Sequence, residues 1–478
     1  HDALPIYTTT LATIVLLGGF FLLLFLHIPV TFSLLLSTLC AALINGTQLT
    51  VMVRQMIDGV SSFTLLAIPF FIIMGEIMSA GSISDKIIAL ADLIVGRFRG
   101  GFAYVNCLAS MMFGGISGSA VADVSSLGSV EIPMMVKQGY EKEFSVGLTV
   151  TTACQGVLIP PSHNMVIYAL AAGGISVGAM FMAGAIPGIF LGFCLMAYCF
   201  VKGLIKPNTM PKGAKVGAHD AVRWIKCVPS DKKYGISKKE DSWIIVHTPF
   251  ASFELGKCIK VIIHAILPML TLVIIMGGVS AGIFTATESA AIAAVYTFIL
   301  TYFVFRSARL RDIGSVLKNC LKTLCVVMTL LACAKAFAYM MTELRIPAKI
   351  TTGLISITSN KYILLLIINI LLLVLGCFMD MAPLIMIMTP ILLPVVTSPY
   401  IGMNPIHFGI MLIFNLAVGL CTPPVGTALF VGCAIGKSPL ERTAIKTVGM
   451  FAVMFIALLF VTFIPWFTLW LPNLLHLL

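Results

Sequence analysis

The sequence predicts an all-α polytopic membrane protein made of an inverted structural repeat, with two re-entrant helical hairpins and two broken helices. Its 478 residues are 59% hydrophobic and 10% charged, with a mean hydropathy of +1.06, far outside the averages of soluble domains. A short phrase rich in glycine and proline occurs at residue 156 and again at residue 419, an offset of 263 residues. Polar or glycine-rich phrases also interrupt two other apolar segments.

Apolar stretches near the ~20 residues that a bilayer requires recur along both halves of the chain. The first half has five, at about 11–27, 30–46, 60–80, 145–178 and 183–203. The second half has five more, at about 260–282, 288–305, 322–342, 407–436 and 446–470. Because each half crosses an odd number of times, the two halves must have opposite orientations in the membrane.

The basic residues orient the chain. The net charge is +11, and placing residue 202 in the cytoplasm puts 25 of the 30 lysines and arginines on that side. Such a bias is typical of a correct topology under the positive-inside rule. We therefore expect a multi-pass membrane protein, surrounded by the lipid bilayer, with a cytoplasmic connector at 206–259 and no nucleic-acid partner.

The duplicated phrase predicts one broken helix in each half. Gly156-Val-Leu-Ile-Pro-Pro161 returns as Gly419-Leu-Cys-Thr-Pro-Pro424. Proline lacks a backbone donor and clashes with the preceding turn, so each phrase should unwind its helix. Unwound backbone is tolerated at membrane depth only where protein buries it or where it lines a cavity. Two such breaks in corresponding positions predict a midplane substrate site in a secondary transporter.

The two interrupted segments predict the hairpins. Residues 102–135 are broken by a phrase from Gly114 to Asp123, and residues 361–398 by a phrase from Gly376 to Pro383. Both flanks of each segment must lie on one side for the charge distribution to hold, which indicates re-entrant hairpins. The 263-residue register places Ser117 opposite Asp380. Hairpin tips and helix breaks thus share one register, as an inverted repeat requires.

This register divides the chain into three regions. Residues 1–205 form the first repeat, with its hairpin at about 102–135 and its broken helix at about 145–178. Residues 206–259 are the connector, and residues 260–478 form the second repeat, with its hairpin at about 361–398 and its broken helix at about 407–436. Amphipathic segments at 81–100 and 343–360 are too short to span, and we expect them to brace a static scaffold. The moving part is then about 102–180 and 361–438.

Broken helices expose the chemistry of a cation-coupled carrier. Unwound carbonyls are oxygen donors that suit Na+, and half-helix N-termini suit a carboxylate. We expect Ser117 and Ser119 to complete one cation site with carbonyls of the first break. Asp380 and Thr422 complete a second site with the carbonyl of Gly419. No catalytic residue is predicted.

At this point several phrases resemble one family. They include the hairpin tip ending in Asp123, the phrase Ile159-Pro-Pro-Ser162 followed by Ile167-Tyr168, Thr422-Pro-Pro-Val-Gly426 and Phe284-Thr-Ala-Thr-Glu-Ser-Ala290. Over about 10–205 and 260–470 the chain is similar to the large membrane subunit of tripartite ATP-independent periplasmic (TRAP) transporters. The resemblance implies an elevator-type, Na+-coupled importer of an organic acid anion, C4-dicarboxylate-like or a sugar acid such as sialic acid. It also implies a small four-helix membrane subunit and a periplasmic binding protein as partners, and the bacterial inner membrane as the location.

The resemblance also implies the residues of each site, where hairpin tips meet broken helices. The first sodium site comprises Ser117, Ser119, Gly156, Ile159 and Pro161. The second comprises Gly376, Asp380, Gly419, Thr422 and Pro424. We expect substrate to lie near Gly118, Ser162, His163, Asn164, Pro423 and Val425. Gly114 departs from the family pattern, because many relatives carry serine there.

Two acidic residues have competing interpretations. Asp123 either contributes to the first site or caps the outgoing helix of the hairpin. Glu288 follows Thr285 and Thr287 at a helix start, where a capping role is favoured over a functional one.

Alternative functions remain open. A stand-alone Na+/dicarboxylate symporter of similar hairpin architecture needs no binding protein. An intramembrane serine protease is a remote alternative, because Gly115-Ile-Ser117-Gly118 matches a Gly-x-Ser-Gly phrase and His163 can act as a base. A protease, however, gives no reason for the second set of residues at Asp380 and Thr422. No phosphate-binding loop for ATP is present in the sequence.

Overall fold

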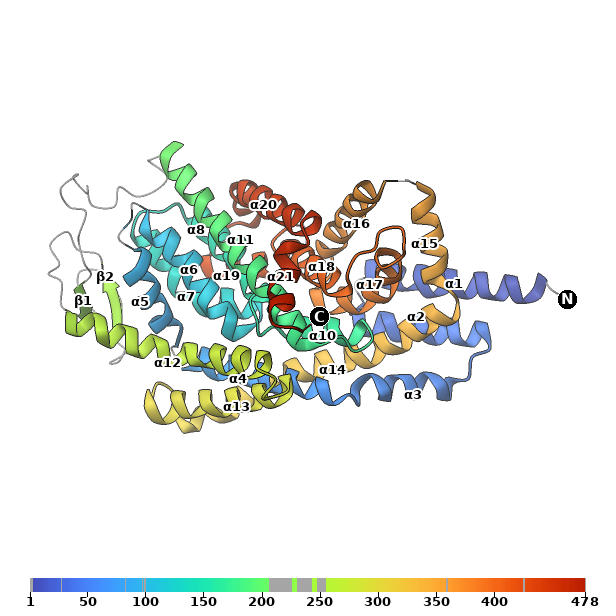
Figure 1. Ribbon diagram of the computed structural model, residues 1–478, viewed down its shortest axis with the longest axis horizontal. Helices are drawn as coiled ribbons and strands as arrows, with labels where there is room; N and C mark the ends of the chain where they lie inside the picture. Colours follow the sequence, from blue (N-terminus) through green and yellow to red (C-terminus); the bar gives the residue numbers. More distant parts are fainter. Residues whose placement is uncertain are drawn as a thin grey trace.

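The computed structural model is helical almost throughout the residues that it describes (Figure 1). These residues are 3–26, 28–81, 83–96, 98, 100–205, 226–229, 243–246, 255–357, 360–423 and 426–477. Among the described residues, seven helical segments are long and apolar enough to cross a membrane: Thr8–Phe25, Phe63–Ala80, Val177–Leu204, Val261–Ser280, Ala286–Val304, Leu310–Glu343 and Leu440–Phe463. The prediction of an all-α polytopic membrane protein is therefore confirmed.

The first half runs from α1 to α11. Its first elements are α1 (Ala3–Phe25), α2 (Val30–Asn45), α3 (Leu49–Val60), the 3-10 turn η1 (Phe63–Leu66), α4 (Ala67–Ala80) and α5 (Ile83–Val95). They are followed by α6 (Gly101–Ser117), α7 (Ala120–Lys137), α8 (Lys142–Ala153), α9 (Gln155–Leu158), α10 (His163–Ala171) and α11 (Val177–Ile205).

The second half runs from α12 to α21. It begins with α12 (Leu255–Ser280), α13 (Ala286–Ile299), the π-helical turn η3 (Leu300–Val304), the 3-10 turn η4 (Leu310–Asp312), α14 (Ile313–Glu343) and α15 (Ile346–Ile357). It continues with α16 (Lys361–Gly376), α17 (Met381–Val396), α18 (Pro405–Gly419), α19 (Thr427–Gly436), α20 (Leu440–Phe463) and α21 (Trp466–Leu474). Between the halves, the short strands β1 (Lys226–Pro229) and β2 (Trp243–Val246) pair antiparallel. The rest of the expected connector lies outside the described residues.

Local sequence explains where the helices stop. Gly118 adopts a left-handed φ of +60° between α6 and α7, and Ser119 then caps α7. Asp380 caps α17 by accepting a hydrogen bond from the backbone N–H of Met381. Both polar interruptions of the sequence are thus helix breaks, since glycine tolerates the left-handed region and a short acidic side chain satisfies free amides. We call α6, Gly118 and α7 the first hairpin.

Paired prolines break the other two helices. Residues 159–162 separate α9 from α10, and residues 420–426 separate α18 from α19. Pro160 and Pro161 have no N–H, so the carbonyls of Gly156 and Val157 lack their usual partner four residues on. Pro423 has the same effect on the carbonyl of Gly419.

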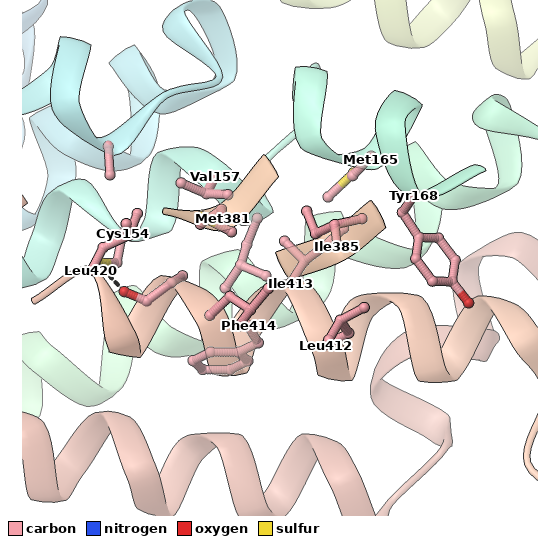
Figure 2. Close-up of a cluster of buried hydrophobic side chains, with 14 of the residues drawn as sticks. Cys154, Val157, Met165, Tyr168, Met381, Ile385, Leu412, Ile413, Phe414 and Leu420 are labelled. Carbon is pink, nitrogen blue, oxygen red and sulfur yellow. Dashed lines mark hydrogen bonds between the residues drawn. The ribbon is translucent and has the colours of Figure 1, made fainter. Parts of the chain in front are cut away.

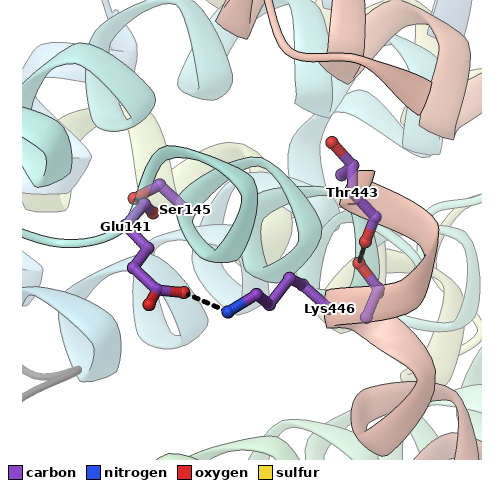
Figure 3. Close-up of polar contacts among 5 residues, drawn as sticks. Glu141, Ser145, Thr443 and Lys446 are labelled. Carbon is purple, nitrogen blue, oxygen red and sulfur yellow. Dashed lines mark hydrogen bonds and ion pairs between the residues drawn. The ribbon is translucent and has the colours of Figure 1, made fainter. Parts of the chain in front are cut away.

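The two halves interlock. The helix after the first break, α10, packs against α17, and the helix after the second break, α19, packs against α7 and α8. Figure 2 shows the first of these contacts, where Met165 of α10 lies beside Ile385 of α17, above Leu412 and Ile413 of α18. The two halves are also joined by a 2.8 Å ion pair between Lys446 of α20 and Glu141, the residue before α8 (Figure 3).

A row of helices lies along one edge of the molecule in Figure 1. Along this row α12 packs on α13, α13 on α4, α4 on α14, and α14 on α3 and α2. The amphipathic segments predicted at 81–100 and 343–360 are helices here, α5 and α15, which contact α6 and α17 respectively.

Several predicted boundaries are wrong. The span expected at 446–470 is two helices, because Pro465 cannot continue α20. The broken helix expected to end near 178 ends at Ala171, where Gly173 and Gly174 turn the chain with positive φ before α11. Helix α3 was not predicted, because Arg54 and Asp58 lower its hydropathy.

Glycine-to-alanine substitutions test the packing at the second break. A Cβ on Gly419 would lie 2.8 Å from the Cα of Gly376, whereas a Cβ on Gly277 of α12 meets nothing within 4 Å. We expect Gly419→Ala to lower the free energy of unfolding by about 1–3 kcal/mol through overpacking. Gly277→Ala should leave it unchanged or slightly higher. Thermal unfolding of the detergent-solubilised protein measures both, and equal midpoints for the two variants would contradict the packing.

Candidate functional site

The tip of the first hairpin lies directly on the first helix break. A Cβ on Gly156 would lie 2.8 Å from the Cα of Gly114, so the two backbones touch without side chains between them. A Cβ on Gly115 would lie 3.3 Å from the carbonyl oxygen of Pro160, and one on Gly118 would lie 3.2 Å from the Cα of Ser162. The glycines of the tip therefore let backbone approach the carbonyls of the break.

Ser117 and Asp123 form a buried polar pair at this contact. The Ser117 hydroxyl donates to Oδ1 of Asp123 at 3.1 Å. The other oxygen, Oδ2, is buried without a hydrogen-bond partner, and it lies 3.0 Å from where a Cβ of Gly156 would be. Ser119 caps α7, with Ala122 N donating to its hydroxyl at 3.5 Å. Asp123 is therefore not the cap of the hairpin helix.

These groups together form an oxygen-rich environment. The Ser117 hydroxyl and the carboxylate of Asp123, one of whose oxygens has no partner among the described residues, lie beside Gly156, the residue at which the first break begins. Hydroxyl, carboxylate and carbonyl oxygens are the ligands that hard monovalent cations prefer. In the described part of the chain no cluster of three histidine, cysteine or acidic side chains suited to a metal ion is present.

The second break has the same backbone contact with different side chains. Gly419 lies against Gly376, as Gly156 lies against Gly114. The Thr422 hydroxyl donates to the carbonyl of Gly419 at 2.9 Å and lies 3.0 Å from the sulfur of Cys377. Asp380 is exposed and caps α17. Pro424 and Val425 lie outside the described residues.

The two halves also share a buried hydrogen bond between two polar side chains of neighbouring helices. Asn106 of α6 accepts a hydrogen bond from Thr152 of α8 at 2.7 Å through Oδ1. In the 263-residue register their counterparts are Asn369 of α16 and Asn415 of α18, and Oδ1 of Asn369 accepts from Asn415 at 2.9 Å. Sequence reasoning missed these pairs, although the register relates them.

The residues expected near substrate follow the first break. Ser162 is buried, and its hydroxyl has no hydrogen-bond partner. His163 begins α10 and is half-buried, and the Asn164 amide lies 3.9 Å from the sulfur of Met381, next to Asp380. Pro423 is exposed at the second break. The first break is thus adjacent to the start of α17 in the other half.

The remaining candidates have structural roles. Glu288 and Thr285 form a reciprocal capping box at the start of α13, which confirms the capping interpretation.

Ser117 donates to Asp123, and no hydrogen bond joins it to His163 within the described residues. That geometry lacks the nucleophile–base contact that a serine protease requires.

Helices that break at paired prolines in both halves, inside a bundle of membrane-spanning helices, are typical of a secondary transporter. The family model of the tripartite ATP-independent periplasmic transporter DctM component matches residues 17–467. The chain belongs to this family, whose members are permease subunits of transporters and not enzymes.

Named relatives cover nearly the whole chain. An uncharacterized protein, YgiK, of Salmonella typhimurium is 36% identical over 96% of this chain and 97% of its own. The C4-dicarboxylate TRAP transporter large permease protein DctM of Vibrio cholerae is 34% identical over 94% of each. The sialic acid permease SiaM of the same organism is 34% identical over 95% of this chain and 97% of its own.

A solved transporter shares the fold. The YdaH transporter of Alcanivorax borkumensis superposes with a TM-score of 0.58, covering 90% of this chain and 89% of its own, at 12% sequence identity. At that identity the likeness concerns the fold alone.

A pair of glycine substitutions tests the docking of the hairpin tip. Gly118 and Gly402 both have positive φ, but only Gly118 has the break within reach of an added Cβ. Alanine at either position costs roughly 1–2 kcal/mol of backbone strain. We expect Gly118→Ala to cost more than Gly402→Ala in thermal unfolding and to impair transport as well. Equal effects of the two variants would mean that the tip does not depend on this contact.

Proposed function

We propose that this chain is the large permease subunit of a TRAP system, importing an organic acid anion across the inner membrane by Na+-coupled, elevator-type secondary transport. The observation that carries the proposal is the repeated contact between a glycine of an interrupted helix and a glycine of a broken helix. It occurs at Gly114–Gly156 and at Gly376–Gly419, within one residue of the same 263-residue register. Two such sites are what an inverted-repeat carrier places around its substrate.

The sodium sites follow from the oxygens at each contact. In the first, Ser117, Ser119 and Asp123 act with carbonyls of Gly156, Ile159 and Pro161. In the second, Thr422 and Asp380 act with carbonyls near Gly376, Gly419 and Pro424. The first site has the stronger support, because the free carboxylate oxygen of Asp123 is buried against it.

The substrate class is suggested by the names of two relatives. C4-dicarboxylate and sialic acid, the substrates in the names of two relatives, both carry a carboxylate. The N-terminus of α10, with the buried Ser162 hydroxyl before it and Asn164 in its first turn, offers donors and a positive dipole end to such a group. We propose a small dicarboxylate or a sugar acid as substrate, bound near Gly118, His163, Pro423 and Val425.

The contacts between the two halves support a single moving unit in the elevator mechanism. The contacts of α10 with α17, and of α19 with α7, join the two regions at about 102–180 and 361–438. The row formed by α12, α13, α4, α14 and α3 is the proposed scaffold, which contacts the small four-helix subunit. In this proposal the connector at 206–259 is cytoplasmic, and a periplasmic binding protein delivers substrate to the opposite face.

Reconstituted uptake tests the proposal. Proteoliposomes with this chain and the small subunit receive an inward Na+ gradient and labelled organic acids, with or without the binding protein. We expect uptake that requires both Na+ and the binding protein. Uptake with Na+ alone would instead indicate the stand-alone symporter, and no response to Na+ would overturn the coupling.

Two hydroxyl deletions test the sodium sites in that assay. Ser117→Ala and Thr422→Val each remove an oxygen at one break, and we expect each to raise the half-saturating Na+ concentration about tenfold or more, equivalent to about 1.4 kcal/mol. Ser125→Ala is the matched control, because Ser125 is exposed on α7 and bonds only its own helix. Unchanged Na+ dependence in both variants would remove these residues from the sites.

A further inference from the structure

A second polar cluster lies inside the first hairpin, away from its tip. It contains one acidic side chain, Glu131 of α7, and polar groups from the two neighbouring helices: Asn106 and Ser110 of α6, and Thr149 and Thr152 of α8. All are at most 1% exposed. Neither the residues expected at the sodium sites nor those expected near substrate include any of them.

Asn106 lies at the centre of this cluster with its amide fully used. Its Nδ2 donates to Oε2 of Glu131 and to the hydroxyl of Thr149, both at 2.7 Å. Its Oδ1 accepts from Thr152 at 2.7 Å. One side chain thereby joins α6, α7 and α8, the two helices of the hairpin and the helix that leads to the break.

Glu131 is incompletely satisfied. Its Oε2 accepts from Asn106, but Oε1 is buried without a hydrogen-bond partner. Within the described residues no lysine, arginine or histidine forms an ion pair with it. In the described part of the chain, Asp123 of α7 and Cys107 of α6 are the titratable neighbours whose charges interact with Glu131. An ionised carboxylate in such a place costs several kcal/mol.

The inverted repeat supplies an internal comparison. Asn369, the counterpart of Asn106, bonds to Asn415 and lies 3.4 Å from the hydroxyl of Thr462. In the 263-residue register the counterpart of Glu131 is Pro394, which has no ionisable group. The second half builds the same asparagine contact without an acid. The shared fold therefore does not require Glu131, and the acid is a feature that the first half adds.

The hydrogen-bond donors around Glu131 favour a proton over a sodium ion at this site. Sodium requires several oxygen ligands, yet Asn106 directs N–H groups, not its oxygen, toward Glu131 and Thr149. Only Oε1 remains free, and a proton needs only one oxygen. We propose that Glu131 holds a proton in the folded protein, so that the first hairpin contains a proton-binding site separate from its tip. The proposal does not depend on Na+ coupling.

The proton has a structural consequence for the tip. From Glu131 the hydrogen bonds continue through Asn106 and Thr152 to Ser110, which donates to Thr152 at 3.3 Å. Ser110 lies one helical turn before Gly114, whose backbone contacts Gly156. Loss of the proton would leave a negative charge buried between α6, α7 and α8, with no basic side chain paired to it among the described residues. Protonation of Glu131 therefore favours docking of the hairpin on α8.

Infrared spectroscopy of the purified full chain tests this directly, with the proton itself as the probe. A protonated carboxylic acid gives a carbonyl stretch separate from the amide and carboxylate bands, and the band shifts in D2O. We expect this band near neutral pH in the wild type and the loss of one carboxyl's intensity in Glu131→Gln. Glu141→Gln is the matched control, because Glu141 is exposed and paired with Lys446.

Further variants make each outcome decisive. Asp123→Asn separates any contribution of the other buried acid, and the Glu131 band should persist in it. If Glu131→Gln does not fold, Glu131→Asp should shift the band, since the shorter side chain changes the bond to Asn106. A wild-type spectrum without the band, or an unchanged band in Glu131→Gln, would overturn the proposal. Uptake assays do not enter this test, so failed Na+ coupling would leave its result intact.

Discussion

Backbone hydrogen bonding is the constraint on which the rest of this structure depends. Lipid offers no partner to a free carbonyl, so a broken helix must be covered by protein wherever it breaks. The paired prolines at 160–161 and 423–424 remove backbone donors in both halves of the chain. Each break is covered by an interrupted helical segment that approaches through glycine, at Gly114 and at Gly376. The absence of side chains at these contacts lets one backbone shield another.

The two halves share this backbone geometry but not its chemistry. Each half has a glycine pair at its helix break and a buried, hydrogen-bonded asparagine, which is Asn106 in the first half and Asn369 in the second. The first half then adds two buried acids, Asp123 and Glu131, whereas the second has an exposed Asp380 and the Cys377–Thr422 contact. The same backbone geometry thus carries two unlike electrostatic environments.

Much of this architecture follows from the sequence, because its strongest determinants are local. Prolines and glycines end helices without help from distant residues, so the breaks at 159–162 and 420–426 and the turn at Gly118 could be predicted from the residues alone. The tertiary partners could not. Nothing local indicates that Asn106 binds Glu131 25 residues later, or that Ser117 rather than a backbone amide is the partner of Asp123. Such pairs depend on how helices rotate when they pack.

The interlocking of the halves has a consequence for how the chain is made. Asn164 and its contact Met381 are separated by 217 residues. During synthesis the first break therefore enters the membrane long before α17 exists to lie against α10. Until α17 is made, the first hairpin, which precedes the break in the chain, is already available to cover the backbone of the break. The hairpin that covers the first break is therefore synthesised before the break itself.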